Sequence, residues 1–119
     1  CPLTEETRGL IDRAAFAAMK PTAVLINVAR GPIVDEDALY AALKDKRIRG
    51  ATLDVWYAYP RHDDLTVAPS KHPFFDLDNV WMTPHPSAWT TGMVARRWSE
   101  IAGNLDALAR GEPLRYRLK

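Results

Sequence analysis

The fold is decided by the stretch Thr22-Ala-Val-Leu-Ile-Asn-Val-Ala-Arg-Gly-Pro-Ile-Val-Asp-Glu36. Within it, residues 23–29 are apolar apart from Asn27. A short continuous apolar run of this kind is typical of a strand buried on both faces, and such strands belong mainly to parallel sheets covered by helices. We therefore expect a central parallel strand over residues 23–28.

The carboxyl end of this strand carries a charge. Arg30 comes directly after the apolar run, and Gly31-Pro32 cannot continue a strand. Asp35 is a suitable N-cap for a helix that begins at Glu36. Open α/β sheets bind their ligands at the carboxyl ends of the strands, so Arg30 is the first candidate functional residue.

The rest of the chain repeats this organisation. Periodicity and turn residues predict a short helix capped by Asp12, two further strands, a long irregular loop and a long final helix. The short helix covers residues 11–19, the two strands 51–56 and 79–83, the loop 57–78 and the final helix 88–110. The pattern predicts an α/β fold: the carboxyl-terminal half of a doubly wound, Rossmann-like parallel sheet, followed by a long helix.

The final helix has an apolar stripe that needs a partner surface. Its large apolar residues recur at three- and four-residue spacing, namely Val94, Trp98, Ile101, Leu105 and Leu108. We expect the tail over residues 114–119 to dock on a surface outside this chain. The chain opens with Cys1 rather than Met, and we expect it to be a fragment of a longer protein.

Composition narrows the functional class. The chain has 119 residues, 47% hydrophobic and 26% charged, which is typical of one globular domain. A net charge of +1 gives no reason to expect nucleic acid as a partner, and no apolar run approaches the roughly 18 residues of a membrane span. Cys1 is the only cysteine, which favours a reducing cytoplasm.

Each of the three predicted strands has a polar residue with useful chemistry near or just after its carboxyl end: Arg30, Asp54 and His85. A guanidinium binds a carboxylate bidentately, and an imidazole transfers protons near neutral pH. Asp54 is suited to accept a hydrogen bond from a ligand amide. Each residue also fits an ordinary structural role: a surface ion pair for Arg30, a loop ion pair or N-cap for Asp54, and a structural histidine for His85.

The other histidines do not indicate a metal site. His62 and His72 lie in the long loop without ligand-like spacing to one another or to Cys1. We therefore predict no metal.

Several ordered blocks carry a family resemblance that covers nearly the whole chain. They are Pro2-Leu3-Thr4-Glu5-Glu6-Thr7-Arg8-Gly9-Leu10-Ile11, Ile26-Asn27-Val28-Ala29-Arg30-Gly31, Asp35-Glu36-Asp37-Ala38-Leu39, Gly50-Ala51-Thr52-Leu53-Asp54-Val55-Trp56 and Asn79-Val80-Trp81-Met82-Thr83-Pro84-His85. In this order they resemble the D-isomer-specific 2-hydroxyacid dehydrogenases, which include phosphoglycerate and formate dehydrogenases. The resemblance implies an NAD(P)-dependent oxidoreductase that interconverts D-2-hydroxy acids and 2-keto acids, with NAD favoured as cofactor.

The resemblance also implies roles for individual residues. Arg30 would hold the substrate carboxylate, His85 would transfer the proton, and Asp54 would contact the nicotinamide carboxamide. The cofactor side of the cleft would be lined by Cys1, Pro2, Leu3, Thr4, Asn27, Val28, Ala29 and Ser87. Residues 1–86 would form the second half of the NAD(P)-binding domain, and residues 87–119 a crossing helix and tail that pack on a substrate domain. The parent protein would be a homodimer.

Two departures from the family pattern matter. Most relatives place a glutamate immediately before the proline at Pro60, whereas this chain has Tyr59 there. A tyrosine hydroxyl can orient an imidazole but adds no negative charge, so we count Tyr59 among the catalytic candidates. The chain also lacks the Gly-x-Gly-x-x-Gly phosphate-binding motif, so we expect it to be inactive in isolation. Tyr59 keeps open the alternative of a non-catalytic, corepressor-like binding protein.

Overall fold

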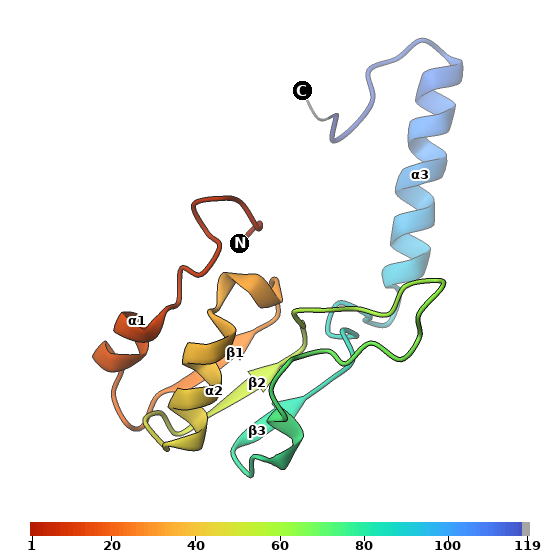
Figure 1. The fold of residues 1–119 in the computed structure, drawn as a ribbon. Helices are drawn as coiled ribbons and strands as arrows, with labels where there is room; N and C mark the ends of the chain where they lie inside the picture. Colours follow the sequence, from red (N-terminus) through yellow and green to blue (C-terminus); the bar gives the residue numbers. More distant parts are fainter. Residues whose placement is uncertain (118–119) are drawn as a thin grey trace. The chain divides into compact units, whose positions relative to one another are not determined.

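The computed structural model describes residues 1–117 (Figure 1). Its elements are α1 (Arg13–Ala18), β1 (Val24–Asn27), the 3-10 turn η1 (Gly31–Ile33), α2 (Glu36–Lys44), β2 (Gly50–Leu53), the 3-10 turn η2 (Phe74–Asp76), β3 (Val80–Met82) and α3 (Met93–Ala109). Residues 1–87 form one compact unit and the residues after Ser87 a second. The last two residues of the tail for which we predicted docking, Leu118 and Lys119, lie outside the described residues.

The three strands form one parallel sheet in the order β1-β2-β3, as the α/β pattern predicted. Their register places Leu25, Ala51 and Val80 in one row across the sheet. The next row contains Ile26, Thr52 and Trp81. Because side chains alternate along a strand, these two rows face opposite sides of the sheet.

Helices α1 and α2 cover the face that carries the first row. Phe16 from α1 and Leu39 and Leu43 from α2 pack into one buried cluster with Ala51 and Leu53 of β2. Leu43 is completely inaccessible to solvent. Figure 1 shows α2 running alongside the sheet, with α1 beside it. This cluster is the hydrophobic core of the unit, and it fixes the positions of the strand ends.

The opposite face of the sheet is exposed in this chain. Ile26 is 67% exposed and Trp81 is 73% exposed. The prediction that the central strand is buried on both faces is therefore wrong for this chain. The physical reason is that the helices of residues 1–87 both pack on the other face, so nothing in that unit covers this one.

The predicted helix starts at Asp12 and Asp35 are confirmed. The Asp12 carboxylate accepts a hydrogen bond from the amide of Ala15, and the Asp35 carboxylate accepts one from the amide of Ala38, at 2.9 and 2.8 Å. These bonds satisfy amides that have no partner within the helix. The loop over residues 57–78 is irregular as predicted, apart from η2 and an isolated bridge between Arg61 and Asp64.

Helix α3 begins later than predicted. We expected it to start at Ala88, but it starts at Met93 because Gly92 adopts a left-handed conformation with φ of 78°. The residues of its predicted apolar stripe are exposed, with exposed fractions between 42% for Ile101 and 64% for Trp98. Within residues 1–117, none of the helices combines the length and the apolar character needed to cross a bilayer.

Candidate active site

Asn27, the last residue of β1, shapes the turn that carries Arg30. Its side chain is buried, with 7% of the residue exposed. The side-chain oxygen accepts a hydrogen bond from the amide of Ala29, and the side-chain amide donates to the carbonyl of Arg30, both at 3.1 Å. The backbone carbonyl of Asn27 accepts a bond from the amide of Asp54 at 3.0 Å. The Asn27 side chain, for which we predicted a place beside the cofactor, thus also holds the local turn.

Arg30 is exposed at the end of β1. One guanidinium nitrogen donates to the carbonyl of Ala29 at 2.6 Å. Among residues 1–117, no carboxylate forms an ion pair with Arg30, so the structure gives no support to an ordinary surface ion pair. A guanidinium has five N–H donors, and those that Ala29 does not use are available to an anionic ligand.

Gly31 holds the Arg30 turn against the end of β2. A Cβ atom at this position would lie 2.3 Å from the backbone oxygen of Trp56, closer than any side chain can approach. Only glycine allows this contact between the two backbones. The sequence pattern indicated only that Gly31 ends a strand, so this constraint on the site was missed.

Asp54 is buried at the end of β2, with 1% of the residue exposed. One carboxylate oxygen accepts a hydrogen bond from the hydroxyl of Thr83, and the other accepts one from the amide of Ser87 at 3.1 Å. Burial raises the pKa of the Asp54 carboxyl, but the hydrogen bonds from Ser87 and Thr83, together with the nearby His85 imidazole, outweigh burial and lower the pKa overall. The site therefore keeps a buried negative charge.

His85 lies in the segment after β3, between two prolines, and adopts a left-handed conformation with φ of 65°. Thr83, at the start of this segment, is fixed by its backbone as well as by its side chain. Its amide donates to the carbonyl of Leu53, and its carbonyl accepts from the indole of Trp56, both at 3.0 Å. Thr83 and Trp56 were not among the predicted site residues. The position of Thr83 directly before Pro84-His85 is the sequence signal that could have identified it.

Tyr59 lies next to His85, with 5.6 Å between the ring centroids and 40° between the ring planes. Its hydroxyl oxygen accepts a hydrogen bond from the amide of Trp56 at 2.9 Å. Within residues 1–117, the contact with the imidazole is between the rings, and no hydrogen bond joins the tyrosine hydroxyl to His85.

Residues 9–11 run beside the turn after β1. The amide of Gly9 donates to the carbonyl of Pro32 at 2.9 Å, which joins the two segments. The hydroxyl of Thr7 donates to the carbonyl of Pro2 at 2.8 Å and accepts from the amide of Thr4. Of the predicted cofactor-lining residues, Cys1, Pro2, Thr4, Val28 and Ser87 are exposed, and Leu3 and Ala29 are partly buried.

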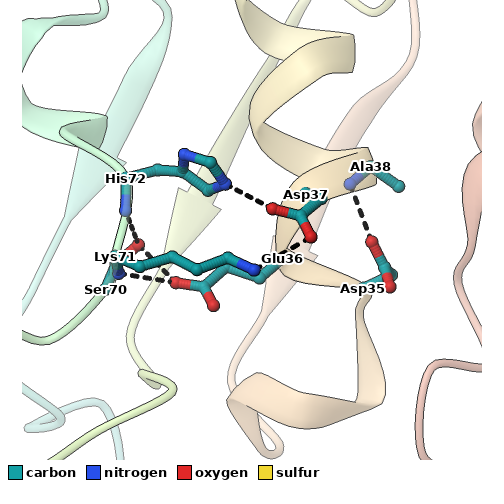
Figure 2. A network of polar contacts seen from close by, with 7 residues as sticks. All are labelled: Asp35, Glu36, Asp37, Ala38, Ser70, Lys71 and His72. Carbon is teal, nitrogen blue, oxygen red and sulfur yellow. Dashed lines mark hydrogen bonds and ion pairs between the residues drawn. The ribbon is translucent and has the colours of Figure 1, made fainter.

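A polar network fastens the loop over residues 57–78 to the first turn of α2 (Figure 2). One carboxylate oxygen of Glu36 accepts from the hydroxyl of Ser70 at 2.6 Å and from the amide of Lys71 at 2.9 Å. The same loop carries Tyr59, so this network helps to hold the tyrosine near the strand ends.

Asp37 supplies the second half of the network. Its carboxylate pairs with the ammonium of Lys71 at 2.9 Å and with the imidazole of His72 at 2.6 Å, as Figure 2 shows. His72 also stacks on Tyr40, with 4.5 Å between the ring centroids. Hydrogen bonds from Lys71, followed by His72, lower the pKa of Asp37. His72 thus has a structural role, and no group of three potential metal ligands occurs within residues 1–117.

The hydroxyl of Tyr57 lies within the electrostatic influence of this network. Burial, followed by the charges of Glu36, Asp35 and Asp37, raises the pKa of the Tyr57 hydroxyl strongly. Its amide donates to the carbonyl of Pro69 at 3.1 Å, which closes the base of the loop.

Comparisons with known proteins point to one family. The family model described as D-isomer specific 2-hydroxyacid dehydrogenase, NAD binding domain, matches residues 1–87. A glyoxylate reductase from Thermofilum pendens is 43% identical over 111 residues, which are 93% of this chain and 31% of that protein. The chain spans 20% of the length of a D-3-phosphoglycerate dehydrogenase from Methanocaldococcus jannaschii and 34% of a hydroxyphenylpyruvate reductase from Plectranthus scutellarioides, which are both 40% identical to it.

Solved structures give the same result. The crystal structure of D-lactate dehydrogenase with NAD+ from Lactobacillus jensenii matches the whole chain with a TM-score of 0.86 and 32% identity, over 38% of its own length. A D-isomer specific 2-hydroxyacid dehydrogenase from Xanthobacter autotrophicus Py2, in complex with NADPH and MES, matches the whole chain with a TM-score of 0.77 and 38% identity, over 46% of its length.

The network at Asp37 generates a pH prediction. Because the pKa of Asp37 is below its ordinary value of 3.8 in the folded chain, its stabilising effect is complete above about pH 3.8 and is lost as the pH falls through the folded-state value. We expect Asp37→Asn to lower the free energy of unfolding at neutral pH. The difference in this free energy between the variant and the unmodified chain should close on acidification. Urea unfolding at several pH values measures this difference.

The control for this experiment is Asp63→Asn, which removes an exposed carboxylate from the loop over residues 57–78. It should leave the stability near that of the parent chain across the pH range. A difference in the free energy of unfolding that persists undiminished well below pH 3.8 would show that the Asp37 carboxylate is not its source.

Proposed function

Because the chain belongs to the D-isomer specific 2-hydroxyacid dehydrogenase family, we propose that its parent protein interconverts D-2-hydroxy acids and 2-keto acids by hydride transfer with NAD or NADP. The observation that carries the proposal is the meeting of three strand ends that bear Arg30, Asp54 and His85. Contacts of Trp56 with Gly31 and Thr83 link these ends. NAD is favoured because the matching family model is that of an NAD binding domain.

In the proposed site, Arg30 binds the carboxylate of the substrate. Arg30 is exposed and has no carboxylate partner within residues 1–117, so the donors that Ala29 does not use are free for a bidentate contact. The same charge polarises the adjacent keto group. His85 donates a proton to the keto oxygen during reduction and removes it during oxidation. Tyr59 borders the imidazole through its ring and limits the positions that His85 can take.

The cofactor supplies the hydride chemistry when it is bound, and this chain supplies part of its surroundings. We propose that the cofactor side is lined by Cys1, Pro2, Leu3, Thr4, Asn27, Val28, Ala29 and Ser87. Support comes from the bond between Gly9 and Pro32, which joins the segment that follows Thr4 to the turn after β1. Asp54 accepts a bond from the nicotinamide amide through the lone pairs that Thr83 and Ser87 leave unused.

The proposed division of the chain follows from these roles. Residues 1–86 form the second half of the NAD(P)-binding domain, and residues 87–119 form a crossing helix and tail that pack on the substrate domain. The exposed apolar stripe of α3 supports the second part, because a row of large exposed apolar side chains marks a contact surface.

Tyr59 favours a second candidate function, a dehydrogenase-like binding protein that works through partner contacts. Arg30→Lys in the full-length protein separates the two. In an enzyme it should lower kcat/KM for glyoxylate, hydroxypyruvate or pyruvate by roughly 100-fold or more, since an ammonium cannot reproduce the bidentate contact that stabilises developing charge. Steady-state oxidation of NADH measures the effect.

The matched control is Arg97→Lys, which changes an exposed arginine of α3 and should leave turnover unchanged. Absence of keto-acid reduction by the unmodified full-length protein, with either nicotinamide cofactor, would contradict the enzymatic proposal. It would favour the binding protein instead.

The isolated chain should bind the cofactor weakly. It has no Gly-x-Gly-x-x-Gly motif for the pyrophosphate, so we expect millimolar or weaker affinity for NADH and no turnover. Titration of the chain with NADH, followed by changes in its amide NMR spectrum, measures the affinity. Micromolar binding together with turnover would overturn this expectation.

We also propose that the parent protein is a homodimer of the reducing cytoplasm. The apolar side chains of α3 that the substrate domain leaves uncovered supply a surface for association, and the exposed free thiol of Cys1 fits a compartment in which thiols stay reduced. We expect light scattering of the full-length protein to give twice the mass of one chain. A monomer at micromolar concentration would contradict the dimer.

A further inference from the structure

Residues 83–87 form a short segment that is fixed at both ends to one buried carboxylate. The hydroxyl of Thr83 donates to one oxygen of Asp54, and the amide of Ser87 donates to the other. With 1% of the residue exposed, Asp54 has little access to water. Loss of either hydrogen bond would leave a buried charged oxygen without that partner, which is costly, so the two bonds hold the segment firmly.

Thr83 is the more tightly held end. All three of its polar groups are engaged within this unit: the amide with Leu53, the carbonyl with the indole of Trp56, and the hydroxyl with Asp54. The first two bonds tie Thr83 to β2 and to the residue that contacts Gly31. The position of Thr83 is therefore set by the same strand end that carries Asp54.

The segment between these ends needs this support because His85 is strained. A φ of 65° is unfavourable for any residue with a side chain, and residues in such conformations persist only where their surroundings over-determine them. Pro84 and Pro86 restrict the backbone on both sides but have no amide proton to bond with. The two bonds to Asp54 are thus what closes the segment around His85.

We propose that Asp54 and Thr83 are positioning residues that hold His85 in its left-handed conformation, with its imidazole against Tyr59. This role rests on the proposed function of His85 in proton transfer. It goes beyond the contact of Asp54 with a cofactor, because it acts through the protein's own segment and needs no ligand. It also gives a role to Thr83, which has no part in the proposed binding of substrate or cofactor.

Thr83→Val tests the proposal because it keeps the shape of the side chain and removes the hydroxyl. In NMR spectra of this chain, we expect protection of the Ser87 amide from hydrogen exchange to fall by about tenfold or more. We also expect the nuclear Overhauser contacts between the rings of Tyr59 and His85 to weaken. Thr83→Ser restores the hydroxyl and should bring back both signals, and Asp54→Asn should resemble Thr83→Val.

The matched control is Thr66→Val. Its hydroxyl also donates to a carboxylate, that of Asp64 at 2.8 Å, but in the exposed part of the loop over residues 57–78. It should leave the Ser87 and His85 signals unchanged. A Thr83→Val spectrum in which the Ser87 protection and the ring contacts are both retained would overturn the proposal.

Kinetics of the full-length protein distinguish this proposal from the proposed function. A positioning role predicts that Thr83→Val lowers kcat by about tenfold or more, with the KM for the cofactor changed by less than about twofold and activity regained in Thr83→Ser. A loss confined to KM would contradict a positioning role. If the unmodified protein has no turnover, the enzymatic function fails, and the NMR result still decides whether Asp54 and Thr83 hold His85.

Discussion

The arrangement of the site depends on two hydrogen bonds that the buried carboxylate of Asp54 accepts. This carboxylate lies at the end of the middle strand, and its two oxygens bind both ends of the segment that carries His85. Burial opposes ionisation, yet the hydrogen bonds keep the pKa of this carboxyl low. Because the carboxylate stays ionised, it binds both hydrogen-bond donors strongly. We propose that these two bonds keep the strained His85 in place.

The remaining parts of the site are fixed by backbone contact and by a surface network. Parallel pairing brings the carboxyl ends of the three strands to one edge of the sheet, and Gly31 lets the Arg30 turn approach the backbone of Trp56. In addition, acidic residues in the first turn of α2 hold the long loop that carries Tyr59. The proposed substrate-binding charge, the proposed proton-transfer group and its aromatic neighbour therefore come from three separate segments joined by short-range contacts.

Much of the fold could be predicted because it is encoded locally. Local sequence determines the caps at Asp12 and Asp35 and the apolar run of each strand, and the structure has the predicted elements. What failed depends on distant parts of the chain. Exposure of the β1 face is decided by which helices cover it, and the late start of α3 by a positive φ at Gly92. Likewise, the polar residues at strand ends could be named from sequence, but the bonds of Thr83 and Trp56 arise only in the folded unit.

The central claim is that these strand ends form one site for a 2-keto acid. A crystal structure of the full-length protein with NAD+ and oxamate, an unreactive analogue of pyruvate, tests it most directly. The account predicts that the oxamate carboxylate lies on the guanidinium of Arg30 and that its amide carbonyl oxygen lies within hydrogen-bond distance of the His85 imidazole. Oxamate bound away from Arg30, or an imidazole turned away from the ligand, would contradict the account.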